Sequence, residues 1–160
     1  MNGKVVFKSA TENDFEDILR LEAESFNLYD RLDRETLIDL FEEFRKGFYT
    51  IAVDGVVAGY SVFLIEDGAG YIESIAISNK YRRRGLGQLA LKFMLKCIID
   101  MGIKDINLHV RMDNMPAMSL YEKEGFAKEE IVPGFYKDGE SAYLYSKKEK
   151  IVSNINIGVN

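Results

Sequence analysis

The spacing of hydrophobic residues changes several times along the chain, and each change marks a predicted element. A short strand is predicted at 5–8, and apolar residues then follow helical spacing after the N-cap residues Thr11 and Asp33. The next three segments have the residues of strands, at 48–53, 56–66 and 71–77. The turn Asp54–Gly55 favours a hairpin between the first two of them. The first half therefore predicts a strand, two helices and an antiparallel meander.

Helices and strands alternate in the second half. An apolar helix is predicted at 85–101, followed by a strand at 104–111 in which hydrophobic and polar side chains alternate. Asn114 caps a further helix, and strands at 126–132 and 142–146 form a closing antiparallel pair. Because a helix joins the fourth and fifth strands, these two are expected to be parallel. This order predicts an α+β (mixed α/β) fold with a central mixed sheet of six to seven strands flanked by about four helices.

Length and composition are those of one folded domain. The chain has 160 residues, 47% hydrophobic and 29% charged, so we expect one domain over 1–150 and a weakly patterned tail at 151–160. The N-terminal apolar run is too short for a signal peptide, and no window approaches the roughly 20 apolar residues that span a bilayer. The single cysteine, Cys97, rules out an internal disulfide and agrees with a cytoplasmic protein.

The charge balance limits the expected partners. The sequence holds 26 acidic and 21 basic residues, a net charge of −5, which argues against general nucleic-acid binding. No membrane partner is expected, and the chain is expected to act as a monomer or a weak homodimer.

Three consecutive arginines nevertheless stand in the stretch YRRRGLG, residues 81–87. Gly85 and Gly87 allow a tight turn with exposed N–H groups, and the N-terminus of the following helix adds free donors and a positive dipole end. With the arginines they form a predicted cradle for phosphate or pyrophosphate. The alternative is a loop whose arginines are only solvated. Gly85, Gly87 and Ala90 also fit a dinucleotide fingerprint, but there the first glycine follows its strand directly, and here a loop intervenes.

At this loop the sequence resembles the GNAT acetyltransferases, which carry R/Q-x-x-G-x-G/A, matched here by 82–87. The resemblance covers roughly 5–147 and is strongest to the protein N-terminal acetyltransferases, of the bacterial ribosomal-protein kind and their archaeal and eukaryotic relatives. Further matches are SIAI at 74–77, LHVRMDN at 108–114, LYEKEGF at 120–126 and GFYKDGESAYLY at 134–145. It implies an enzyme, an N-alpha-acetyltransferase that uses acetyl-CoA as co-substrate, needs no metal, and acts on protein or peptide N-termini.

By this resemblance, three parts of the chain would contact acetyl-CoA. The fourth strand would hydrogen-bond the pantetheine arm, the arginine–glycine loop would hold the pyrophosphate, and the helix after 114 would contact the arm again. The residues concerned are Ile75, Ala76, Ile77, Arg82, Arg83, Arg84, Gly85, Leu86, Gly87, Gln88, Asn114 and Tyr121.

The resemblance also implies catalytic residues. Tyr121 matches a tyrosine near the thioester sulfur that acts as general acid, and its alternative role is packing of a helix on the sheet. His109, the only histidine, matches a base that in one eukaryotic branch works with a tyrosine, here Tyr71. The bacterial branch has a glutamate at the histidine position, and Glu73, on the same strand face as Tyr71, is the reserve base. The alternatives are an exposed strand histidine and a solvated glutamate.

The acceptor amine is expected to enter opposite the co-substrate. The residues that resemble the family's peptide-gripping loops are Phe26, Leu28, Tyr29, Phe135 and Tyr136, whose alternative role is to close the ends of the core. An α-amine with a pKa of about 7.7–8.0 is easier to deprotonate than a lysine near about 10.4, which favours N-termini. Two other functions stay open: a small-amine (polyamine-like) N-acetyltransferase and a catalytically silent acyl-CoA-binding module.

Overall fold

The computed structural model describes residues 3–150, so the tail predicted at 151–160 lies outside the described residues. The strands form one mixed sheet in the order β1-β2-β3-β4-β5-β7-β6. They are β1 (Val5–Ser9), β2 (Phe48–Val53), β3 (Val56–Glu66), β4 (Ala69–Ile77), β5 (Asp105–Arg111), β6 (Ala127–Val132) and β7 (Ala142–Lys148). The α-helices are α1 (Phe15–Ser25), α2 (Arg34–Glu43), α3 (Leu86–Asp100) and α4 (Met115–Lys123), and short 3-10 turns lie at Glu12–Asp14, Arg45–Gly47 and Asn79–Tyr81.

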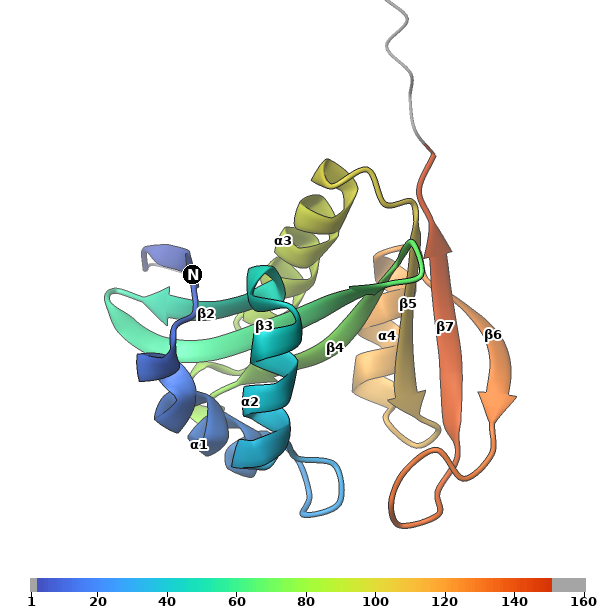
Figure 1. Ribbon diagram of the computed structural model, residues 1–160, viewed down its shortest axis with the longest axis horizontal. Coiled ribbons are helices and arrows are strands. Elements are labelled where there is room, and N and C mark those ends of the chain that lie inside the picture. The colour runs from blue at the N-terminus through green and yellow to red at the C-terminus, as the bar shows by residue number, and fades with distance from the viewer. Residues whose placement is uncertain (1–2, 151–160) are drawn as a thin grey trace, which may run out of the picture.

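Helices cover both faces of the sheet (Figure 1). On one face, Ile18 of α1 and Leu37 and Phe41 of α2 are buried against β2 and β3. On the other, Leu91 of α3 and Met118 of α4 are buried against β4, β5 and β7. The predicted fold class, a mixed sheet flanked by four helices, is confirmed.

Several predicted boundaries differ from the observed ones by one or two residues. Two examples show a strand ladder that continues further than predicted. The turn predicted at 67–70 is shorter, since Ala69 and Gly70 already pair with β3. The last strand was predicted to end at 146, but it runs on to Lys148, which pairs with Asp105 at the start of β5. Strand length here depends on the partner strand, which local sequence does not reveal.

Strand β4 carries a bulge. Residues 62–63 of β3 pair with Ser74 and Ile72, so Glu73 is an extra residue in β4. The extra residue reverses the alternation of side chains between the two faces of the sheet. As a result, Ile72 and Ile75, which are three positions apart, both pack on the α3 side. Ser74 consequently points to the α1 side, where it hydrogen-bonds Glu22.

The parallel pairing of β4 with β5 is confirmed, but the ladder is short. The paired residues are Gly70 with Ile106 and Tyr71 with Asn107. Beyond them β4 pairs with β3 alone, so the other backbone edge of 75–77 has no described strand beside it. Figure 1 shows β1 to β4 running across the view, whereas β5, β7 and β6 stand nearly upright. The two halves of the sheet therefore diverge at this point.

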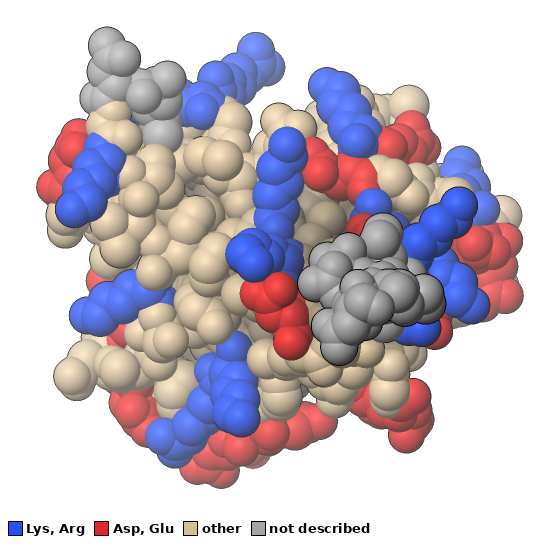
Figure 2. Space-filling model, turned by 90° about the horizontal axis from the view of Figure 1, so that it is seen from above, with Lys and Arg blue, Asp and Glu red and all other residues tan. Residues whose placement is uncertain are grey.

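Within residues 3–150 no helix has the length and apolar character needed to cross a membrane. Figure 2 shows Lys and Arg side chains separated by acidic and uncharged residues over the face seen from above.

Replacing Gly47 with alanine should strongly destabilise the fold. A Cβ at Gly47 would lie 1.8 Å from the backbone oxygen of Phe63 on β3, and a backbone atom cannot move aside cheaply. We expect the free energy of unfolding to fall by at least about 2 kcal/mol, measured by urea denaturation. The matched control is Gly87→Ala in α3, where the nearest atom is 3.8 Å away and no loss is expected. Wild-type stability in the Gly47 variant would contradict this packing.

Candidate functional site

A cavity of about 700 Å³ lies where β4 and β5 separate. Its walls come from β4, the first turn of α3 and the loop before it, the α1–α2 loop, the start of α4 and the β6–β7 loop. The predicted site residues that line it are Phe26, Tyr29, Glu73, Ile75, Ile77, Arg82, Arg83, Gly85, Leu86, Gly87, His109, Asn114, Tyr121, Phe135 and Tyr136. Those that do not line it are Leu28, Tyr71, Ala76, Arg84 and Gln88.

One end of the cavity has the geometry of an anion cradle. Gly85 is the N-cap of α3 and has a left-handed backbone, with φ of 79°, and Arg83 is also left-handed, with φ of 59°. This turn brings the free N–H groups of the first α3 residues, Leu86 and Gly87, to the cavity wall. The helix dipole and Arg83 add positive charge at the same end, so it suits a phosphate group.

Arg82 has a different role from its neighbour. Its Nε donates to the carbonyl oxygen of Ile77 at 2.9 Å, and its Nη2 donates to the hydroxyl of Ser25 at 3.1 Å and to the carbonyl of Glu24 at 3.2 Å. The guanidinium therefore fastens the cradle to β4 and α1, although its side chain still lines the cavity. The sequence shows an arginine here but not that backbone carbonyls accept its hydrogen bonds.

The predicted residues outside the cavity have other partners. Arg84 lies over the ring of Tyr81, with its guanidinium carbon 5.6 Å from the ring centroid. The amide of Gln88 donates to Glu124 on the far side of the first α3 turn, at 2.9 Å. Ala76 is buried between the sheet and α1, and Leu28 is 73% exposed. Their side chains therefore face away from the ligand space.

Helix α4 contributes Tyr121 and its N-cap residue Asn114 to the cavity wall. Tyr121 packs against Phe126 and Tyr145, with ring centroids 6.0 and 6.4 Å away, and burial raises its pKa to about 12. Its hydroxyl is therefore protonated at neutral pH. Asn114 caps α4 by accepting from the N–H of Ala117 at 3.2 Å, as the sequence predicts, and it also lines the cavity.

Two titratable side chains also line the cavity. Glu73 lies two residues beyond Tyr71, where the β4–β5 ladder ends, and His109 lies two residues beyond Asn107, the partner of Tyr71. Tyr71 itself does not line the cavity. The structure therefore places Glu73 and His109, but not Tyr71, in the cavity wall.

The environment shifts the pKa values of this pair in opposite directions. Glu73 is open to the cavity, but the surrounding protein penalises its charge and raises its pKa, and Glu22 and Glu43 add to the rise. His109 is half-buried beneath the ring of Phe135, stacked 4.2 Å away, and burial lowers its pKa while Glu130 partly opposes this. Both shifts favour the neutral form of the group concerned.

Glu22 is a buried acid in the cavity wall that the sequence analysis missed. It is 1% exposed. Its carboxylate accepts from the N–H of Leu32 at 2.8 Å, from the hydroxyl of Ser74 at 3.0 Å and from the hydroxyl of Tyr60. These bonds join α1 to the returning α1–α2 loop and to the β4 bulge. A charged residue at an inward position of an amphipathic helix is the signal that could have revealed it.

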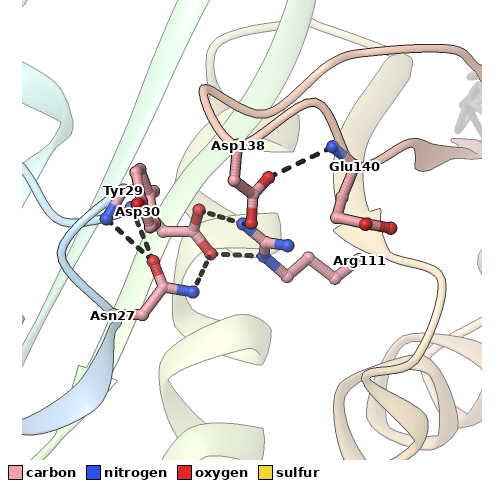
Figure 3. A network of polar contacts seen from close by, with 6 residues as sticks. All are labelled: Asn27, Tyr29, Asp30, Arg111, Asp138 and Glu140. Carbon is pink, nitrogen blue, oxygen red and sulfur yellow. Dashed lines mark hydrogen bonds and ion pairs between the residues drawn. The ribbon is translucent and has the colours of Figure 1, made fainter.

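Arg111, the last residue of β5, was also missed as a site residue, and it joins two loops (Figure 3). Its Nε and Nη2 donate to the two carboxylate oxygens of Asp30 at 2.5 and 2.6 Å, and Nη2 also donates to Asp138 at 2.9 Å. The hydrogen bond to Asp30 is the largest cause that raises the pKa of Arg111. The partners are 81 and 27 residues away in sequence, so no local pattern marks this contact.

Comparison with known families identifies the chain. The profile of the acetyltransferase (GNAT) family matches residues 14–126. This chain belongs to the GNAT family of acetyltransferases. The match confirms the resemblance first seen at 82–87 and the predicted enzyme class. Within residues 3–150 no cluster of three or more His, Cys, Asp or Glu side chains is placed to hold a metal ion.

Relatives of this GNAT chain include protein N-terminal acetyltransferases. The N-alpha-acetyltransferase of Saccharolobus solfataricus is 34% identical over 123 residues, which cover 69% of this chain and 74% of the relative. Ard1 from Thermoplasma volcanium has a TM-score of 0.84 at 24% identity, covering 91% of this chain and 98% of that one. Naa50 of Arabidopsis thaliana, solved with the bisubstrate analogue CoA-Ac-MVNAL, has a TM-score of 0.77 at 19% identity, covering 91% and 99%. The two solved structures share the fold.

Replacing Glu22 with glutamine should remove a pH-dependent part of the stability. Burial, the largest cause, raises the folded pKa of Glu22 above 4.5, so its contribution is fully present below that pH and is lost as pH rises through the folded value. The stability gap between wild type and Glu22→Gln should therefore be widest near about pH 4 and narrow toward about pH 8, measured by urea unfolding.

Glu24→Gln is the matched control on the same helix. A backbone hydrogen bond from Asn79 is the main cause that lowers the pKa of Glu24, so its contribution is lost as pH falls. Its stability gap should narrow toward acid, opposite to that of Glu22→Gln. A gap for Glu22→Gln that widens with rising pH would contradict the raised pKa.

Proposed function

We propose that this GNAT chain is an N-alpha-acetyltransferase that moves the acetyl group of acetyl-CoA to the free N-terminal amine of proteins or peptides. The observation that carries the proposal is that one cavity is lined by an anion cradle, Tyr121, Glu73 and His109. The names of the relatives, N-alpha-acetyltransferase among them, support the same substrate. The single thiol, Cys97, supports the further expectation of a cytoplasmic enzyme, acting as a monomer or weak homodimer.

The cradle and the free edge of β4 fit two parts of the coenzyme. The N–H groups at the start of α3 and the side chain of Arg83 would bind the pyrophosphate, and Arg82 would hold this loop in place. The backbone edge of 75–77, which lacks a described neighbouring strand, offers hydrogen bonds to the amide-bearing pantetheine arm, and Asn114 lines the same cavity. Ala76 would contact the pantetheine arm through its backbone alone. Arg84 and Gln88 would make no direct contact with the coenzyme.

Glu73 and His109 would take the proton of the incoming amine. We assign the larger share to Glu73, because it is open to the cavity and its raised pKa brings it closer to the about 7.7–8.0 of an α-ammonium group. His109 has a lowered pKa, so its imidazole is neutral and able to accept a proton. Tyr71 has no direct part in this proposal, since its side chain does not line the cavity.

Tyr121 would complete the reaction. The amine nitrogen forms a bond to the thioester carbonyl carbon, a backbone N–H of β4 stabilises the oxyanion, and the carbon–sulfur bond then breaks. The departing thiolate takes the proton of the Tyr121 hydroxyl, whose pKa of about 12 keeps that proton in place until it is needed. The proton removed from the amine restores the tyrosine through solvent, so the reaction is balanced in protons.

Aromatic side chains from the two loops form the walls around the acceptor. Phe26 and Tyr29 come from the α1–α2 loop, and Phe135 and Tyr136 come from the β6–β7 loop. Tyr29 and Phe135 remain 55% and 44% exposed. Apolar surface that stays open inside a cavity is suited to the first side chains of a peptide.

A small cationic amine is the second candidate acceptor. Glu22, Asp30 and Glu73 all line the cavity, and such acidic groups would attract a polyamine. However, Asp30 is paired with Arg111, and the Glu22 carboxylate is saturated by hydrogen bonds and has a raised pKa. Of these three acids, Glu73 is then the one left to interact with an acceptor. A single carboxylate suits an acceptor with one amine better than it suits a polycation.

Acetyl transfer to a panel of acceptors tests the function directly. We expect acetyl-CoA turnover with short peptides that have free N-termini, and little with N-blocked lysine peptides or spermidine. Free thiol release measures the rate, and mass spectrometry locates the acetyl group. Turnover with spermidine alone would replace the substrate with a small amine. Acetyl-CoA binding without turnover of any acceptor would point to a silent binding module.

Substitutions in the cavity should separate the chemical steps from binding. Glu73→Gln and Tyr121→Phe should each lower kcat by roughly 10²–10⁴-fold, and His109→Asn by a smaller factor, while acetyl-CoA affinity stays near that of wild type. Glu66→Gln and Tyr143→Phe are matched controls, because neither side chain lines the cavity. Wild-type kcat in both Glu73→Gln and His109→Asn would place the base elsewhere.

A further inference from the structure

The cluster around Arg111 has no part in the reaction as described, yet it is built into the cavity wall. Arg111, Asp30 and Asp138 keep 17%, 13% and 24% of their side chains exposed, so the cluster is largely shielded from water. A bidentate guanidinium–carboxylate pair in such a place holds its partners in one orientation. Both carboxylates lie in loops, one between α1 and α2 and the other between β6 and β7 (Figure 3).

A continuous series of contacts leads from Arg111 to His109. The guanidinium lies 4.2 Å from the ring centroid of Tyr136. Tyr136 meets Phe135 edge to face at 5.0 Å, and Phe135 stacks on His109 at 4.2 Å with only 15° between the ring planes. The cover over His109 therefore belongs to the same loop that Arg111 holds through Asp138.

We propose that Arg111 is a positioning residue for the acceptor end of the cavity: by binding Asp30 and Asp138 together it holds the two loops in one rim and keeps Phe135 stacked on His109. The inference rests on the proposed function insofar as the rim grips a peptide. We call the ion pairs of Arg111 with Asp30 and Asp138 the loop clamp. Without the clamp the β6–β7 loop can move away, which exposes His109 to water and loosens the walls that hold the acceptor. The anion cradle at the other end is not touched.

The only histidine of the chain makes this clamp directly measurable, because its NMR titration needs no assignment among several rings. Burial lowers the pKa of His109 below 6.5, and the ring of Phe135 is stacked on the imidazole. Glu130 is the charge that acts on the ring, Arg111 pairs with Asp30 and Asp138 beside its cover, and Glu73 and Lys137 line the same cavity. Arg111→Lys keeps the charge of this set but loses the fork that reaches both carboxylates.

In Arg111→Lys we expect the pKa of His109 to rise toward 6.5, because the loosened loop lets water reach the ring. The KM for a peptide acceptor should rise roughly tenfold with a smaller change in kcat, and acetyl-CoA affinity should stay unchanged. Arg45→Lys is the matched control: Arg45 also pairs with a carboxylate, Glu12 at 3.1 Å, and lies over a ring, Phe41 at 4.9 Å, but it lies outside the cavity.

Asp138→Asn provides a second variant and separates the clamp from simple electrostatics. Removing a negative charge should by itself lower the pKa of a nearby histidine, whereas release of the loop should raise it. A rise in the pKa of His109 in Asp138→Asn therefore supports the clamp. The titration of Asp138→Asn also tests the clamp if Arg111→Lys does not fold.

An unchanged or lowered pKa of His109 in both folded variants would overturn the proposal. The titration needs no substrate, so it also separates this proposal from the proposed function. If the wild type acetylates no peptide but the pKa of His109 rises in the variants, the clamp stands and the peptide substrate falls. If peptides are acetylated and neither the pKa nor the peptide KM changes, the clamp falls and the function stands.

Discussion

The divergence of β4 from β5 is the constraint on which the site depends. A parallel pair that continued past Tyr71 would satisfy the backbone of both strands and leave no space between them. Because the ladder stops, the edge of 75–77 keeps hydrogen-bonding capacity and a cavity of about 700 Å³ opens beside it. The extra residue at the bulge, Glu73, stands at this opening. One local departure from a regular sheet thus supplies the space, the polar edge and a candidate base.

Long polar side chains join the elements around this opening. Arg82 ties the cradle to β4 and α1, Arg111 ties the two acceptor loops, and Glu22 ties α1 to β3 and β4. Each makes at least three hydrogen bonds to other protein groups, and for the buried Glu22 and the largely shielded Arg111 these bonds offset the cost of burying a charged group. These three residues line the cavity but act mainly on protein partners. Charge in the wall of a site therefore does not by itself mark contact with a ligand.

The sequence predicted the elements well, because each depends on its own residues. Helices such as α3 and strands such as β5 carry complete periodic patterns, and the caps at Asp33 and Asn114 are local features. Many cavity residues were also found, through motifs that lie close together in the chain. What local sequence could not show depends on register: the pairing of distant strands puts Glu73, but not Tyr71, in the cavity wall. The roles of Glu22 and Arg111 were missed for the same reason, since their partners are far away in sequence.

The acid–base properties of the cavity argue for an α-amine over a lysine. Deprotonating a lysine at neutral pH costs roughly 3.5 kcal/mol more than deprotonating an α-amine. Burial raises the pKa of Glu73, which makes its carboxylate a better proton acceptor, and lowers the pKa of His109, which makes its imidazole a weaker one. Such a pair is matched to an amine that is already partly neutral, and chain termini are the common amines of a protein that meet this condition.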